Sequence, residues 1–280
     1  MALCGILSYD AAGDVTFDSS TGNTYLYDAE GRICATQNLL TGQMTGYLYD
    51  GTGTRVAKGT IQNMSSCDPA VNTFQMTTAY ALDLSGEQMT EQDLYADGSM
   101  QWQHTNAWAG GKLLATYDLN GLHFYFDDPL GTRRVQTDSA GRGEQTCGSL
   151  PFGNGETCTP LPTEHLFTGK ERDTESGNDY FGARYYASTM GRFMSPDWAE
   201  DPSNIPYATL SDPQSLNLYS YGLNNPLKNR DSDGHSCDPD YTTTNANGDM
   251  VVHGRWPGHE NRRARQSCAP FIAFFAMSGR

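Results

Sequence analysis

Short apolar stretches that end at a turn recur along residues 1–141. Tyr-Leu-Tyr stands at 25–27 and again at 47–49, each time directly before an aspartate, and a new apolar stretch follows the turn. Runs of this length bounded by turn residues predict strand–turn–strand hairpins. One hairpin is too small to bury its own face, so we expect the units to stack into a continuous antiparallel sheet.

The predicted turns share one tetrad, Asp-x-x-Gly. Aspartate and glycine are favoured at the first and fourth positions of a type I turn, and the aspartate side chain bonds backbone N–H groups ahead of it. Tyrosine directly precedes the tetrad at positions 9, 27, 49 and 117, so we predict that these tyrosines pack in the sheet and do not form sugar-binding platforms. The tetrads are Asp10–Gly13, Asp28–Gly31, Asp50–Gly53, Asp83–Gly86, Asp118–Gly121, Asp128–Gly131 and Asp138–Gly141.

The composition excludes several classes of protein. Among 280 residues, 18% are charged, 11% are aromatic and 30 are glycine, which disfavours a coiled coil, a helical bundle and full disorder. The net charge is −15, and residues 1–235 hold 13 basic against 29 acidic residues. Because such a surface repels phosphate backbones, we expect no nucleic-acid binding by residues 1–235. Residues 236–280 differ, with five arginines against four acids.

Seven cysteines are scattered through the chain without a Cys-x-x-Cys pair, which disfavours a zinc cluster. In an oxidising compartment, Cys147 with Cys158 and Cys237 with Cys268 are the candidate disulfides, and the odd count leaves a free thiol. The N-terminus has no basic region of the kind that opens a signal peptide. The longest apolar run, Pro270–Met277, is far shorter than the ~20 residues of a membrane span. We therefore expect no signal peptide and no membrane span.

Residues beyond 236 contain weak candidates for a metal site and for a nuclease. His253, His259, Cys237 and Cys268 are metal-ligating types, but a six-residue histidine spacing without a carboxylate pattern is a weak indication. The stretch HGRWPGHENRRAR pairs histidine with arginine, as in a nuclease-like toxin, although such stretches are more often solvated basic segments. We predict no metal and no other cofactor.

Several stretches resemble the RHS (YD-repeat) proteins, a family that includes insecticidal toxin-complex subunits and the teneurins. YLYDAEGRI and YLYDGTGTRV resemble the tyrosine–aspartate repeats, and residues 125–153 resemble the segment ahead of the family's core. Residues 165–234 resemble the RHS repeat-associated core domain, with FTGKERDTESGNDYFGARYYASTMGRFMSPD, LNLYSYGLNNPL and DSDG in the family's order. The resemblance implies a mainly-β chain: antiparallel hairpin repeats of a partial β-shell at 1–150, a compact core domain at 151–235, and a short irregular tip at 236–280, which is a variable segment, a truncated toxin or disordered.

The same resemblance implies a chemistry. In the family, the shell holds a C-terminal polypeptide, and the core cuts the chain behind itself by aspartyl-type proteolysis at a DPxGL-like sequence. The family's motif residues fall at Arg184, Asp197 and Asp231, and the cut falls between His235 and Ser236. Two close carboxylates can share a proton and so serve as base and acid, while a guanidinium holds one of them ionised. Such a site turns over once.

Two departures from the motif and three simpler interpretations stand against this chemistry. DSDGH replaces DPxGL, so Ser232 stands for the proline and His235 for the leucine, and we expect a looser segment without the ring. Asp197 could instead cap a turn, Asp231 could belong to an ordinary Asp-x-x-Gly turn, and Arg184 could stack on an aromatic ring.

We therefore keep two functions from different classes open. The first is a truncated RHS protein that carries and releases its own C-terminal polypeptide. Roughly seven hairpins are too few to enclose a folded toxin, so we expect a gene fragment, an orphan cassette end or part of a larger split product. The alternative is a non-catalytic β-repeat module for structure or cell-surface interaction, and a glycan-active enzyme is a weaker third. The expected partners are the C-terminal polypeptide, further shell segments and a secretion machinery. The family resemblance implies a secreted or cell-surface location.

Overall fold

The computed structural model describes residues 5–159, 164–197 and 213–235, and the backbone of the strands at 237–238, 241–244 and 250–253. Fourteen strands form one antiparallel sheet in which neighbours in the sequence are neighbours in the sheet. They are β1 (Leu7–Tyr9), β2 (Val15–Asp18), β3 (Asn23–Tyr27), β4 (Ile33–Asn38), β5 (Met44–Tyr49), β6 (Arg55–Thr60), β7 (Gln75–Leu82), β8 (Gln88–Leu94), β9 (Met100–Ala109), β10 (Lys112–Asp118), β11 (Gly121–Asp127), β12 (Arg133–Thr137), β13 (Gly143–Gly148) and β14 (Thr157–Thr159).

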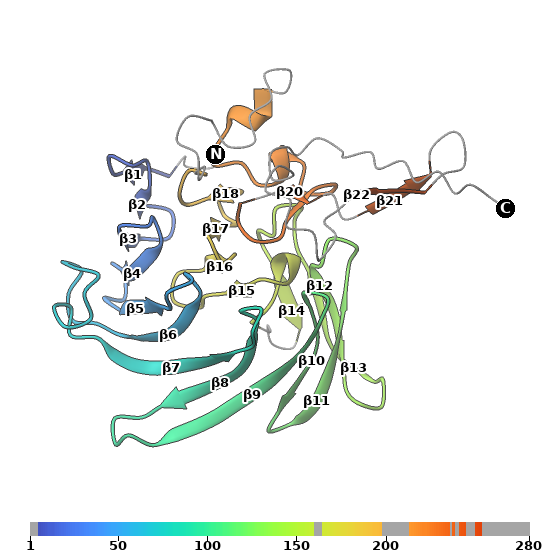
Figure 1. Ribbon diagram of the computed structural model, residues 1–280, viewed down its shortest axis with the longest axis horizontal. Helices are drawn as coiled ribbons and strands as arrows, with labels where there is room; N and C mark the ends of the chain where they lie inside the picture. The colour runs from blue at the N-terminus through green and yellow to red at the C-terminus, as the bar shows by residue number, and fades with distance from the viewer. Residues whose placement is uncertain are drawn as a thin grey trace.

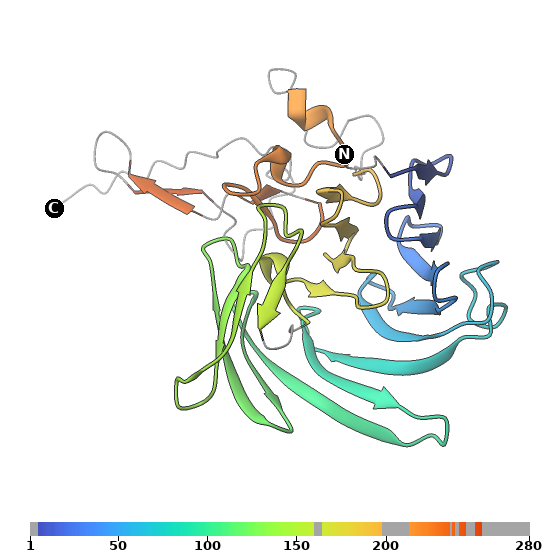
Figure 2. The same ribbon diagram turned by 180° about the vertical axis from the view of Figure 1, so that it is seen from behind.

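A second, smaller sheet lies in the hollow of the large one. The large sheet curves from β1 round to β14, and the four short strands of the small sheet sit inside that curve (Figure 1; Figure 2 shows the same arrangement from behind). The mainly-β, antiparallel prediction is thus confirmed. The remaining elements are β15 (Glu171–Arg172), β16 (Asp179–Tyr180), β17 (Tyr185–Ala187), β18 (Arg192–Phe193), the pair β19 (Arg230–Asp231) and β20 (Cys237–Asp238), the pair β21 (Tyr241–Thr244) and β22 (Met250–His253), and the 3-10 turns η1 (Phe167–Gly169), η2 (Pro213–Leu216) and η3 (Gly222–Asn224).

The Asp-x-x-Gly turns close as their chemistry predicts. At Asp28, the carboxylate Oδ1 accepts the N–H groups of Glu30 and Arg32 at 2.9 and 3.0 Å, and the Gly31 N–H donates to the Asp28 carbonyl at 3.1 Å. Gly31 has a φ of +77°, a conformation that favours glycine, and the register shifts by a bulge just before the turn. The same bonds recur at Asp10, Asp50, Asp83, Asp128 and Asp138.

The prediction of a common turn is wrong at Asp118. Here Asp118 pairs directly with Gly121 as the last rung of the β10–β11 ladder, which leaves a two-residue loop. The Asp118 carboxylate therefore accepts the N–H groups of Asn120 and Gly121. In the other turns the second of these bonds comes from the residue four positions after the aspartate. The tetrad alone does not distinguish these two loop lengths.

The tyrosines of the first hairpins form the contact between the two sheets. Tyr25 and Tyr47 are buried with Tyr185 of β17 in one hydrophobic cluster. The Tyr49 hydroxyl donates to the carbonyl of Ile33 at 2.5 Å and lies 3.0 Å from the Tyr185 hydroxyl. Tyr27 and Tyr49 also pack against this cluster, which confirms the packing prediction for these two. Tyr9 and Tyr117 fit it only in part, because they are 44% and 55% exposed while their rings contact those of Tyr219 and Trp102.

A buried ionic cluster adds a second connection between the sheets, which the sequence did not lead us to expect. The Arg55 guanidinium of β6 lies 2.7 Å from a Glu171 oxygen and 2.8 Å from an Asp173 oxygen, and Lys58 Nζ contacts the same two carboxylates. Arg55 also lies over the Tyr180 ring, 4.4 Å from its centre. Removing one partner would leave a buried charge unpaired, so the cluster fixes the small sheet against β6.

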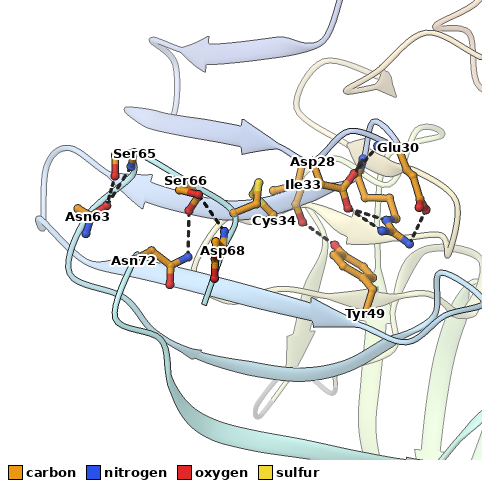
Figure 3. Close-up of a disulfide and its surroundings, with 12 residues drawn as sticks. Asp28, Glu30, Ile33, Cys34, Tyr49, Asn63, Ser65, Ser66, Asp68 and Asn72 are labelled. Carbon is orange, nitrogen blue, oxygen red and sulfur yellow. Dashed lines mark hydrogen bonds and ion pairs between the residues drawn. A yellow bond between two sulfur atoms is a disulfide. The ribbon is translucent and has the colours of Figure 1, made fainter. Parts of the chain in front are cut away.

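Two disulfides link neighbouring parts of the large sheet. Cys147 and Cys158 bridge directly paired positions of β13 and β14, which confirms one of the two candidate pairs. Cys34 of β4 bridges to Cys67 in the loop after β6, a pair that we did not predict (Figure 3). Cys268, of the other candidate pair, lies outside the described residues.

The expected domain boundary near residue 150 stays a prediction; the large sheet itself continues through β14 to Thr159. Within the described parts of the chain, no helix is long and apolar enough to cross a membrane.

Candidate functional site

The segment of the predicted cut is a short hairpin. Its two ends are β19 and β20, in which the backbone of Asp231 pairs with that of Cys237. Hydrogen bonds from the small-sheet region hold the loop between them. Lys170 Nζ donates to the Ser232 carbonyl at 2.6 Å, and the Ala183 N–H donates to the Asp233 carbonyl at 3.1 Å. The segment is therefore fixed to the core at two successive carbonyls, although the proline of the family motif is absent.

Arg184 lies at the centre of the site, in the connection between β16 and β17. Only 3% of Arg184 is exposed, and its Nη2 lies 3.0 Å from Asp197 Oδ2 and 3.7 Å from Asp231 Oδ2. Its Nε donates to the carbonyl of Gly234, inside the hairpin. The three residues predicted from the family motif are therefore brought together around one guanidinium. The interpretation of ring stacking also holds, because the guanidinium carbon lies 3.8 Å from the centre of the Phe193 ring.

Asp231 is buried and has an unusual acidity. It is 2% exposed, and burial raises the pKa of its carboxyl from 3.8 to about 7; Arg184 opposes this rise, and Asp233 and Asp197 add to it. Its Oδ1 accepts the Gly234 N–H at 2.8 Å. Asp231 therefore also closes an Asp-x-x-Gly turn, the alternative role that we considered for it. Near neutral pH, Asp231 can therefore exist as a neutral acid and as a carboxylate.

His235 contacts the second carboxylate of the site. Its ring Nδ1 lies 3.3 Å from Asp197 Oδ1, and its backbone N–H donates to Asp233 Oδ1 at 2.9 Å. The Asp197 N–H donates to the Leu218 carbonyl at 2.9 Å, which fixes the backbone at Asp197. Ser236, the other residue of the predicted cut, lies outside the described residues.

Sequence reasoning missed two contributors to the site. Lys170 supplies the bond to the Ser232 carbonyl, and the carbonyl of Leu218 accepts a hydrogen bond from Arg184 Nη1 at 2.9 Å. Lys170 belongs to the quoted stretch FTGKERD, but neither residue has a type or spacing that indicates catalysis. Of the weak metal candidates, His259 and Cys268 lie outside the described residues, and only the backbone is described at His253 and Cys237.

The arrangement provides the groups that peptide hydrolysis needs. A carboxylate paired with a guanidinium can accept a proton from water, and a neutral carboxyl beside it can donate one. The guanidinium also reaches a carbonyl oxygen of the hairpin, where it can polarise the backbone.

Comparison with known proteins identifies relatives of the chain. No protein-family model matches the chain. The chain is 30% identical over 240 residues to the tRNA3(Ser)-specific nuclease WapA of Bacillus spizizenii, a match that covers 82% of this chain and 9% of the relative. It is 40% identical over 87 residues to the toxin subunit YenC2 of Yersinia entomophaga, which covers 30% of this chain and 8% of the relative.

Solved structures agree on the fold. The crystal structure of TcdB2–TccC3 superimposes with a TM-score of 0.58 and 21% identity over 81% of this chain and 11% of that chain. The chain thus spans less than a tenth of the length of the curated relatives described above. The chain is therefore an RHS-repeat protein, as shown by its tyrosine–aspartate hairpins, by the antiparallel sheet that curves around a small core sheet, and by its similarity to these relatives.

Proposed function

We propose that residues 5–235 form a segment of an RHS shell with its core domain, and that the core hydrolyses the bond between His235 and Ser236 to release the polypeptide that follows. One observation carries the proposal. Arg184 contacts both Asp197 and Asp231 and, through its Nε, the Gly234 carbonyl one residue before the proposed bond.

The proposed reaction divides the work between the two carboxyl groups. Asp197, paired with Arg184, takes a proton from water as the water oxygen bonds to the carbonyl carbon of His235. Asp231, in its neutral form, donates a proton to the nitrogen of Ser236 as the C–N bond breaks. One water is consumed, and the products are a carboxyl group on His235 and an amine on Ser236. Because the bond and the groups belong to one chain, proximity contributes effective molarities that can reach ~10⁵ M or more.

The intramolecular character of this reaction can be tested by dilution. The purified chain would be incubated over a hundredfold range of protein concentration. Intact mass spectrometry would then measure the loss of residues 236–280 over time. We expect the same first-order rate at every concentration. A rate that falls in proportion to dilution would show that a second molecule makes the cut and would contradict the proposal.

The alternative, a non-catalytic shell segment, is supported by a specific contact. The imidazole of His235 lies against Asp197, the carboxylate that would have to accept a proton from water. If this contact blocks the site, the chain stays intact, and its role is to complete the wall of a shell with other RHS segments. Restoring the family residues by Ser232→Pro and His235→Leu separates the two functions, because a decayed site would cut only in the double variant.

The released polypeptide and the location are also proposals. A curated relative that matches 82% of this chain is named a tRNA3(Ser)-specific nuclease, and the five arginines of residues 236–280 suit contact with RNA phosphates. We therefore propose a nuclease segment as the class of cargo. Two disulfides form and persist in an oxidising environment, which supports export to the cell exterior.

A further inference from the structure

Three side chains with metal-ligating atoms meet where the large sheet faces the start of the core. Glu91 of β8 and His104 of β9 are directly paired across the two strands, and Glu164 approaches them from the segment before β15. One ligand atom from each of the three lies within 4.8 Å of the others. The His104 Nε2 lies 3.6 Å from Glu164 Oε2.

His104 is a buried imidazole without a hydrogen-bond partner among the described residues. It is 8% exposed, and its distance to Glu164 is too long for a hydrogen bond. The nearby His123 differs, since its two ring nitrogens lie 2.6 Å from Glu144 and 3.1 Å from Asp118. A ligand on Nε2 would therefore hold His104 in place, as the carboxylates of Glu144 and Asp118 hold His123.

The two glutamates have excess negative charge around them. Glu171 lines the same cavity as both of them; Glu91 is half-buried, and the side chain of Glu164 is 45% exposed. Within the described parts of the chain, no lysine or arginine lies within ion-pair distance of either group. Lys58, which lines the same cavity, already contacts Glu171 and Asp173.

A cavity lined by the two glutamates gives room for water. Its volume is about 230 Å³, and Glu91 and Glu164 line it together with Tyr80 and Glu171. A cation bound by three protein atoms would therefore have space for a further oxygen ligand.

We propose that Glu91, His104 and Glu164 bind one divalent transition-metal ion, with Zn²⁺ as the best match, completed by water from the cavity. One imidazole and two carboxylates are ligands that suit Zn²⁺, at distances of roughly 2.0–2.2 Å. Tetrahedral ligation at such distances places the ligand atoms about 3.4 Å apart, so a shift of the side chains by about 1 Å closes the site. The ion would tie β8 and β9 to the segment that begins the core.

Zinc binding to the full chain tests this proposal. Free thiols are alkylated first, so that cysteines outside the described residues do not compete, and ZnCl₂ is titrated by isothermal calorimetry. We expect one equivalent bound by the unaltered chain. Glu91→Gln and His104→Ala are each expected to weaken binding at least tenfold. His123→Ala is the matched control, because both of its nitrogens have carboxylate partners, and it should leave the affinity unchanged.

A second readout separates binding from folding. Thermal unfolding without zinc shows whether each variant is folded. If His104→Ala does not fold, Glu91→Gln still tests the site, because glutamine has nearly the same shape as glutamate. We expect zinc to raise the midpoint of the unaltered chain and of His123→Ala, but not that of Glu91→Gln. The proposal is overturned if the unaltered chain binds no zinc, or if folded Glu91→Gln binds it as tightly.

Discussion

The imidazole of His235 lies 3.3 Å from the carboxylate of Asp197, measured from Nδ1 to Oδ1. His235 is the residue at which this chain departs from the leucine of the family motif, and Asp197 is the proposed base. The substituted residue therefore contacts one of the two proposed catalytic carboxylates. It places a titratable ring on the group that would have to accept a proton from water.

Replacing that ring should accelerate the cut. In His235→Leu, Asp197 keeps its pairing with Arg184 but loses the contact with the imidazole, so the ring no longer competes with water for Oδ1. We expect a rise in the first-order cleavage rate of about tenfold, read from intact mass against time. His235→Gln is the control, since it keeps a polar group near Asp197. A slower cut in His235→Leu would show that the imidazole assists the reaction.

The high pKa of Asp231 predicts a specific pH dependence of stability. Between 3.8 and about 7 the folded chain holds a proton on Asp231 that the unfolded chain has lost, so the free energy of unfolding falls as the pH rises through this window. The Asp231→Asn variant lacks this contribution. Both forms would carry Asp197→Asn, which keeps the chain in one piece and leaves burial, the main cause of the shift, in place.

Urea unfolding at several pH values between 4 and 7 measures this difference. We expect the form that retains Asp231 to lose stability relative to the Asp231→Asn form as the pH rises. Parallel curves would mean that Asp231 has an ordinary pKa in the folded chain, and the neutral acid of the proposed reaction would then lack support.

The two disulfides should differ in their contributions to stability. The Cys34–Cys67 bond closes a separation of 33 residues, for which chain entropy gives roughly 4 kcal/mol, and the Cys147–Cys158 bond closes 11 residues, for roughly 3 kcal/mol. Replacing both cysteines of one pair by serine and measuring urea unfolding tests each value. An unchanged midpoint in Cys34→Ser/Cys67→Ser would show that this bond does not form in solution.

Local chemistry made part of the fold predictable. The Asp-x-x-Gly turns depend on one carboxylate and one glycine within five residues, so the sequence was enough to predict the turn at Asp28 and its equivalents. The prediction was wrong only at Asp118, where the register of β10 and β11 gives a shorter loop. Contacts between distant residues were different. Arg55 meets Asp173 across 118 positions, and Cys34 meets Cys67 only because β4 and the loop after β6 lie side by side.

The candidate site was reached by resemblance and not by spacing. Arg184, Asp197 and Asp231 were named from family motifs, since nothing in their separation along the chain indicates that one guanidinium contacts both carboxylates. The contact of His235 with Asp197 depends on how the hairpin folds back, which the sequence did not reveal. Likewise, Glu91 and His104 become neighbours only through the register of β8 and β9.

The central claim, that this chain cuts itself with Asp197, is tested most directly by intact mass spectrometry of three purified forms: the unaltered chain, Asp197→Asn and the control Asp138→Asn, which alters an aspartate of a surface turn. Since general acid–base catalysis contributes ~10²–10⁴ in rate, we expect residues 236–280 to be lost from the unaltered chain and from Asp138→Asn, and to be retained in Asp197→Asn. Loss of the segment at equal rates in all three forms, or from none of them, would contradict the account.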